Sequence, residues 1–320
     1  MKIDPNFENT IINLLESSDT YKIKEAFNLC DGYELIDSIG KVMANYPVYC
    51  LQYGMALDYI KGVRLNNDIW NFLEKDLKHL NKLPNLELLD LRSLELQTVP
   101  KNFQQLSSLT MLLAHGNYFK EMPQEIGMLK KLQWLDFSDN RLIKLPVEIG
   151  QLSKLENLYL QGNQIKELPT SFENLQHLKN LIINNNNLRV FPESISELPA
   201  LDLLDLGNNK IDQISNTNTN SNLKTLNVNN NNFGHIPHLT SFFPQLKVCQ
   251  LAGNKILTIN EIKLPYSLER LDLSSNNISL IPEDILGLEF LKFLNLRNNS
   301  LNDKELNTLK KNFPNLIILS

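Results

Sequence analysis

One stretch of the chain, residues 155–169, reads Leu155-x-x-Leu158-x-Leu160-x-x-Asn163-x-Ile165-x-x-Leu168-Pro169. The same frame of apolar residues and asparagine returns every 23 residues, with the step shortened to 22 at two places. A pattern kept through ten copies predicts a repeat protein whose copies stack side by side. The ten frames begin at Leu86, Leu109, Leu132, Leu155, Leu178, Leu201, Leu223, Leu246, Leu268 and Leu291.

The spacing of the leucines predicts a short strand in every copy. Side chains alternate between the faces of a strand, so the leucines point one way and the residues between them the other. A single strand of this kind does not bury its apolar face, whereas copies stacked ~4.8 Å apart in a parallel sheet do. The return segments supply the other side of the core, for example through Leu145, Ile149 and Leu152. Each fully buried side chain contributes roughly 1.5–3 kcal/mol to stability.

An asparagine follows each strand, where the chain has to turn. Leaving the strand deprives backbone groups of their ladder partners, and a carboxamide carries the donors and the acceptor that satisfy them. We expect Asn186→Ala to cost about 1–3 kcal/mol. Asn185, at the preceding exposed position, is expected to tolerate alanine within about 0.5 kcal/mol. The column comprises Asn117, Asn140, Asn163, Asn186, Asn209, Asn231, Asn254, Asn276 and Asn299.

Residues 86–320 resemble the leucine-rich-repeat superfamily in this frame and in the returns at 122–129 and 145–152. Those returns have the form Leu-Pro-x-x-Ile-Gly-x-Leu, which is similar to the class found in plant intracellular Ras-group proteins, their animal scaffold relatives and many bacterial proteins. The resemblance implies an α/β leucine-rich-repeat solenoid, a curved horseshoe with a parallel inner sheet of about ten to eleven strands. It also implies that this inner sheet binds a protein ligand, without indicating which.

Several copies depart from the regular repeat. The first copy has Leu94 in place of the asparagine, as expected of an atypical terminal repeat. The sixth copy replaces its return with the polar run 215–222, expected to be a solvated loop, and the eighth departs over 260–265. Residues 302–311 are expected to form an amphipathic helix that caps the C-terminal end.

Residues 1–83 are predicted to form an all-α N-terminal region, and residues 84–320 the leucine-rich-repeat domain. Asp4-Pro5 is a reasonable helix start, and further helical stretches are expected near 21–30, 33–44, 48–61 and 68–80. Two interpretations stay open. The helices form either a cap over the open edge of the first strand, or HEAT-like pairs with a binding role of their own.

Composition and charge limit the classes of ligand and the cell compartment that we expect for the protein. The net charge of −5 argues against a generic affinity for nucleic acid or anionic lipid, and no segment approaches the ~20 apolar residues of a membrane helix. The N-terminus lacks the basic start and apolar stretch of a signal peptide. Cys30, Cys50 and Cys249 are too few and too scattered for a disulfide framework or a metal cluster. We therefore expect a cytoplasmic protein without membrane insertion and with three free thiols.

The sequence contains no pattern that predicts catalysis, a cofactor or a metal site. It has no Gly-x-x-x-x-Gly-Lys-Ser/Thr phosphate loop, and His235 and His238 have no third ligand near them in sequence. Four aspartates share one column of the inner face, but the closest two lie two strands, roughly 10 Å, apart. That separation suits recognition better than acid–base chemistry. The column comprises Asp90, Asp136, Asp205 and Asp272.

The inner face carries a candidate protein-binding site, because the frame leaves its residues free to vary. Six apolar side chains come from five adjacent strands, and a cluster that contains Trp and Tyr is typical of binding hot spots. The alternatives are an ordinary polar sheet with scattered apolar residues, or a cluster covered by the N-terminal helices. The six are Leu88, Met111, Leu113, Trp134, Tyr159 and Ile182, bordered by Asp136 and Asp205.

These observations predict a protein-interaction module or scaffold, not an enzyme, that binds a partner protein on the concave face. The alternative is a regulatory subunit that inhibits a partner enzyme by covering its active site. Neither function requires a cofactor.

Overall fold

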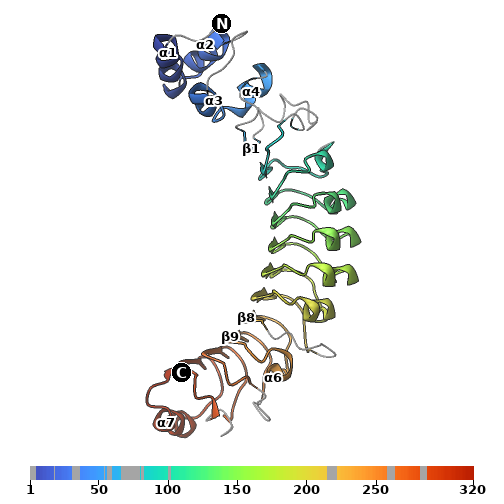
Figure 1. Cartoon of the computed structure of the whole chain (residues 1–320). Helices are drawn as coiled ribbons and strands as arrows, with labels where there is room; N and C mark the ends of the chain where they lie inside the picture. Colours follow the sequence, from blue (N-terminus) through green and yellow to red (C-terminus); the bar gives the residue numbers. More distant parts are fainter. Residues whose placement is uncertain are drawn as a thin grey trace. The chain divides into compact units, whose positions relative to one another are not determined.

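The computed structural model describes residues 5–17, 19–30, 37–53, 55, 60–65, 80, 83–99, 102–214, 222–257, 264–281 and 287–320 (Figure 1). The chain forms two compact units. The first comprises Met1–Leu94 and Val99–Leu113, and the second comprises Glu95–Thr98 and Ala114–Ser320.

The first unit begins with four helices: α1 (Pro5–Glu16), α2 (Thr20–Cys30), α3 (Asp37–Met43) and α4 (Pro47–Tyr53). Their apolar positions recur at helical spacing, so Ile11, Leu15 and Phe27 are fully buried between them. The Phe27 ring also lies 5.5 Å from the ring of Tyr49. These helices confirm the predicted N-terminal helical region. The helix expected near residues 68–80 lies almost wholly outside the described residues.

A strand follows the helices and shows that the expectation of an all-α region over 1–83 was wrong in one place. Strand β1 (Gly62–Arg64) pairs in parallel with β2 (Leu88–Asp90), which pairs with β3 (Met111–Leu113). Ile60, Val63 and Leu65 are buried and repeat the frame's spacing with β-branched residues, 26 positions before Leu86. The copy that contains Leu94 is therefore not the terminal one.

The second unit contains nine parallel strands in chain order, each three residues long. Figure 1 shows them along one side of the unit, with the helical returns on the other side. In eight of the nine strands the middle residue is buried and the outer two are more exposed, as period-2 alternation requires. The strands are β4 (Trp134–Asp136), β5 (Asn157–Tyr159), β6 (Asn180–Ile182), β7 (Leu203–Asp205), β8 (Thr225–Asn227), β9 (Val248–Gln250), β10 (Arg270–Asp272), β11 (Phe293–Asn295) and β12 (Ile317–Leu319).

The returns are mostly single turns of 3₁₀-helix. Each five-residue turn follows a proline in extended conformation, which begins the turn without having to supply a backbone N–H. Neighbouring returns pack closely: a Cβ added at Gly150 would overlap the carbonyl oxygen of Ser171. This steric limit accounts for the glycine in the Ile-Gly of the motif. The turns are η3 (Phe103–Gln105) in the first unit and η4 (Gln124–Met128), η5 (Val147–Gln151), η6 (Thr170–Asn174), η7 (Glu193–Glu197) and α6 (Leu239–Phe242) in the second.

The predicted column of asparagines forms a hydrogen-bonded ladder inside the bend. The Nδ2 of Asn163 donates to the carbonyl of Leu160 in its own repeat at 3.0 Å and to that of Phe137 in the preceding repeat at 2.9 Å. Its Oδ1 accepts from the backbone N–H of Leu142 at 2.9 Å. Asn186 repeats these bonds one step later. Each asparagine thus joins two consecutive repeats.

The residue before each ladder position adopts the left-handed conformation, which corrects the expectation for Asn185. Its φ is 55°, a conformation that asparagine tolerates through local hydrogen bonds of its side chain, so Asn185→Ala is expected to strain the backbone by roughly 1–2 kcal/mol. At Gly162, with φ of 69°, an added Cβ would also overlap Oδ1 of Asp139. The column comprises Ser93, Gly116, Asp139, Gly162, Asn185, Asn208, Asn230, Gly253, Ser275 and Asn298.

The C-terminal helix α7 (Asp303–Asn312) confirms the amphipathic helix predicted over 302–311. Asn302 accepts from the backbone N–H of Glu305 at 3.0 Å, and the Glu305 side chain accepts in return from the Asn302 backbone, which forms a capping box. Leu309 of this helix is buried. The loop expected at 215–222 and the departure over 260–265 fall almost entirely outside the described residues.

We predict that Asn163→Ala lowers the free energy of unfolding by about 1–3 kcal/mol. The buried N–H of Leu142 loses its acceptor, and the carbonyls of Phe137 and Leu160 each keep only one donor, Asn140 and Asn186 respectively. Urea unfolding followed by circular dichroism measures this difference. The matched control is Gln164→Ala, since the neighbouring Gln164 side chain is exposed. A control variant as unstable as Asn163→Ala would contradict the role assigned to the ladder.

Candidate functional site

The strand face is the face of the sheet opposite the core leucines, formed by the first and third residues of each strand. All six apolar residues predicted for the site are half-buried there, and none is fully covered. Leu88, Met111 and Leu113 belong to the first unit, where β2 and β3 place Leu88 beside Met111 and Asp90 beside Leu113. Trp134, Asp136, Tyr159, Ile182 and Asp205 belong to the second unit.

In the second unit the predicted residues are brought together. The rings of Trp134 and Tyr159 stack, with centroids 4.9 Å apart and planes inclined by 24°. Asp136 pairs across strands with Tyr159, Tyr159 with Ile182, and Ile182 with Asp205. These four residues form one continuous line across β4 to β7, which we call the acid-flanked row.

The aspartates of this row also have a structural role that sequence reasoning missed. Oδ1 of Asp136 accepts from the backbone N–H of Ser138 at 2.9 Å and from its hydroxyl at 2.5 Å. Asp205 accepts from the N–H of Gly207 at 2.9 Å, and Asn227 makes the same turn with Asn229 at 3.0 Å. The signal was present in the sequence, since several positions of this column are Asp or Asn, the residues that accept from an N–H two positions on.

Asp90 lies in the same column, for which the sequence predicted a role in recognition, but its carboxylate is paired with two arginines of the chain. It is 3% exposed, and its carboxylate lies 2.9 and 2.8 Å from Nε and Nη2 of Arg92 and 3.5 Å from Nε of Arg64. Burial alone would raise the pKa of Asp90, but the bonds and charge of Arg92 and the charge of Arg64 lower it. Asp90 therefore forms ion pairs with a structural role.

Asp205 shows the opposite shift. Burial raises the pKa of its carboxyl above the usual value, and the hydrogen bonds from Gly207 and Asn227 only partly oppose this effect. Burial likewise raises the pKa of the Tyr159 phenol, with a further contribution from the negative charge of Asp136 beside it. The row therefore combines an apolar centre with acidic groups in a partly desolvated setting.

A serine, a histidine and an aspartate meet next to the row without forming an accessible nucleophile. His115 Nδ1 lies 2.9 Å from Oγ of Ser138 and 3.2 Å from Oδ2 of Asp139. Ser138 is 1% exposed, and its hydroxyl also bonds to Asp136. A substrate does not reach this hydroxyl, so the cluster belongs to the turn.

Among the described residues there is neither a metal-ligating cluster nor a helix able to span a membrane. In those segments no group of three or more His, Cys, Asp or Glu side chains is placed to hold a metal ion. None of the helices described there is both long enough and apolar enough to cross a bilayer. The three cysteines are free and buried, and burial raises the pKa of Cys30 to about 11 and those of Cys50 and Cys249 to about 12.

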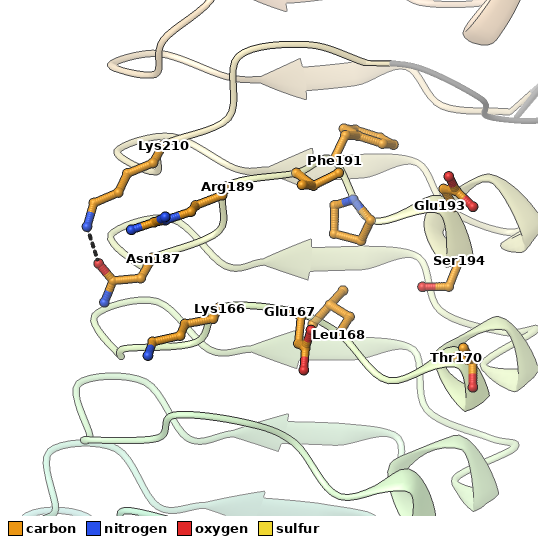
Figure 2. Close-up of a pocket in the computed structure, with 12 residues that line it drawn as sticks. Lys166, Glu167, Leu168, Thr170, Asn187, Arg189, Phe191, Glu193, Ser194 and Lys210 are labelled. Atoms are coloured by element: carbon orange, nitrogen blue, oxygen red, sulfur yellow. Dashed lines mark hydrogen bonds between the residues drawn. The ribbon is translucent and has the colours of Figure 1, made fainter.

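A groove of about 740 Å³ lies among the return segments, away from the strand face (Figure 2). Sequence reasoning did not predict it. Lys166 and Arg189 line it together with Glu167 and Glu193, so charges of both signs face the same space. Lys210 Nζ donates to Asn187 at 2.8 Å across one side of it. The mixed lining favours no single class of ligand.

Family comparisons agree with the repeat. A model of the leucine-rich repeat region matches residues 125–232, and a leucine-rich-repeat model matches residues 222–243 and 267–288. No curated protein sequence matches the chain. The repeated frame, the stacked parallel strands and these matches show that the chain belongs to the leucine-rich-repeat superfamily.

Solved structures share the fold. Internalin InlF of Listeria monocytogenes matches with a TM-score of 0.69 at 19% identity, over 99% of this chain and 95% of that one. The functional domain of InlJ from the same organism matches with a TM-score of 0.60 at 22% identity, over 83% and 54% of the two chains. The plant peptide hormone receptor RGFR1, in complex with RGF2, gives 0.59 at 24% identity, over 85% and 48%.

The raised pKa of Asp205 predicts how stability depends on pH. Its folded-state pKa lies above the unfolded value of about 3.9, so the folded state binds more protons between the two values and loses stability as pH rises through them. Asp205→Asn should therefore gain stability relative to wild type as pH rises from the unfolded value of about 3.9 through the folded-state pKa of Asp205. Urea unfolding at a series of pH values measures the difference.

Asp90→Asn serves as the opposite case. The ion pairs that lower the Asp90 pKa stabilise the fold above the unfolded value and are lost as pH falls. This variant should therefore lose stability relative to wild type as pH rises from the folded-state pKa of Asp90 to the unfolded value of about 3.9. Two slopes of the same sign would refute the assigned electrostatics.

The buried thiols predict slow chemical modification. At pH 8 the folded protein should resist iodoacetamide, because its thiolates form only at higher pH and are enclosed. Denaturation without reductant should expose three reactive thiols, counted by mass spectrometry. A count of one would reveal a disulfide instead.

Proposed function

We propose that the protein binds a partner protein on the strand face, with the acid-flanked row and Trp134 at the centre of the contact. The stacked rings of Trp134 and Tyr159 carry this proposal. These rings lie on a solvated surface outside the hydrophobic core. Clustered aromatic side chains of this kind supply most of the affinity in protein interfaces. Leucine-rich-repeat domains in general serve as interaction modules rather than enzymes.

Rigidity supports the same function. Each residue of the row is fixed by a strand whose middle leucine is fully buried, as Leu135, Leu158 and Leu181 are. A surface held in place in this way loses little conformational entropy when a partner binds. In the first unit Leu88, Met111 and Leu113 give the strand face an apolar surface of its own, which we include in the proposed function as a second contact.

The cysteines and the net charge bear on the cell compartment and on the class of partner. Three separate buried thiols favour a reducing compartment, so we propose a cytoplasmic protein. The net charge of −5 favours a protein partner over nucleic acid. Scaffold and inhibitory subunit are both compatible with this surface, and the partner's activity within the purified complex separates them.

We predict that Trp134→Ala weakens partner binding by at least ~2 kcal/mol while the melting temperature stays unchanged. The partner is first isolated from native lysate on the immobilised wild-type chain, and its affinity is then measured with purified proteins by calorimetry. Loss of a half-buried ring removes contact with the partner and leaves the core intact.

Phe293→Ala is the matched control. Phe293 occupies the same column on β11, seven strands from Trp134, and its ring lies beneath the guanidinium of Arg270 at 4.5 Å. Its loss should weaken binding less. An unchanged affinity for Trp134→Ala, or a lowered melting temperature, would place the binding site elsewhere.

A further inference from the structure

The acid-flanked row has a regular geometry that the strand register fixes. Asp136 and Asp205 stand at its two ends, and Tyr159 and Ile182 lie between them on adjacent strands. The two aspartates are therefore three strand steps apart, roughly 14 Å at the usual spacing of parallel strands. An apolar stretch of surface thus separates two carboxylates by a defined distance.

Within the part of the chain that the structure describes, no Lys or Arg forms an ion pair with either of these two carboxylates. Among the residues that the structure describes, neither Asp136 nor Asp205 has a Lys or Arg nitrogen within 4.0 Å. Asp90, in the same column, has Arg64 and Arg92. The burial that raises the pKa of Asp205 shows that its charge is partly desolvated and would be stabilised by a cation.

We propose that the row binds an extended segment of a protein partner in which two basic residues, four positions apart, flank an apolar residue. The inference rests on the proposed function and specifies its ligand: the basic side chains pair with Asp136 and Asp205, and the apolar side chain contacts Tyr159 and Ile182.

The spacing favours an extended segment over a helix. An extended chain advances ~3.4 Å per residue, so four residues span roughly 14 Å, and residues i, i+2 and i+4 share one side. A helix advances 1.5 Å per residue, and its same-face positions i+7 and i+11 reach roughly 10 and 16 Å. Only the extended form matches the separation of the carboxylates with one apolar side chain midway.

The neighbouring column suits an extended backbone as well. Asn157 and Asn180 lie beside the row on β5 and β6, and Nδ2 of Asn180 donates to Oδ1 of Asn157 at 2.7 Å. Both side chains are half-buried on the strand face. Carboxamides offer donors and acceptors together, which is what the alternating N–H and C=O groups of an extended chain require.

The test selects a phage-displayed library of random 12-residue peptides on the full chain. We expect enrichment of peptides with Lys or Arg at i and i+4 and Leu, Ile, Met or Phe at i+2. One enriched peptide is then synthesised with a fluorophore, and its affinity is measured by polarisation. Asp136→Asn and Asp205→Asn should each weaken it by about fivefold, and rising NaCl should weaken wild type more than the double variant.

Asparagine is the matched replacement because Asn227 holds the same turn in this fold through its own side-chain oxygen. The substitution therefore removes the charge and keeps the hydrogen bond to the turn. Asp272→Asn is the control, since Asp272 lies on β10 outside the row and makes the same turn with Ser274. Its affinity for the peptide should stay within about twofold of wild type.

Each outcome decides the inference separately from the proposed function. Enriched peptides that lack the basic pair but lose affinity in Trp134→Ala would overturn this inference and leave the strand face as a binding surface. Peptides with the basic pair that bind the double variant as well as wild type would also overturn it. If no peptide is enriched, the inference is overturned as well, because the library contains the motif. The proposed function is tested separately, by the effect of Trp134→Ala on binding of the partner.

Discussion

The asparagine ladder is the interaction on which the rest of the structure depends. At the end of each strand the chain bends inside the core, where backbone groups that lose their sheet partners would cost about 1–3 kcal/mol each if left unpaired. Asn163 bonds to Leu160 in its own repeat and to Phe137 and Leu142 in the preceding one. The same hydrogen bonds therefore satisfy the backbone groups of the bend and link successive repeats, which keeps their strands in register.

That register builds the surface on which we propose that a partner binds. Because equivalent residues of neighbouring repeats stand opposite each other, Asp136, Tyr159, Ile182 and Asp205 fall into one line although 69 positions separate the two ends in sequence (205 minus 136). The same turn chemistry reaches this surface, since Asp136 and Asp205 accept hydrogen bonds from the turns that follow them. In the proposed function these side chains serve both recognition and folding, and substitution by asparagine separates the two roles because it removes the charge and keeps the hydrogen bond to the turn.

Prediction from sequence failed where a copy departs from the regular repeat and where the conformation of a residue depends on the neighbouring repeats. Strand β1 escaped notice because its frame uses Ile60 and Val63 in place of leucine and stands 26 residues before the next copy, outside the regular period. The left-handed φ of Asn185 escaped notice because that column also holds aspartate and serine, so no glycine marks it throughout. In both places a locally ambiguous residue takes its conformation from the repeats stacked beside it.

The sequence by itself determined the elements that depend on short-range periodicity. The spacing of leucines specified which side of each strand is buried, and the recurring asparagine specified the bend, because both follow from alternation and hydrogen-bond demand within a single copy. Only the tertiary structure decided which side chains meet across strands. Asp90 and Asp136 occupy the same column, yet Asp90 is paired across strands with Arg64, whereas Asp136 lies against Tyr159. Such contacts depend on side chains that register alone brings within reach, so they exist only once the repeats have stacked.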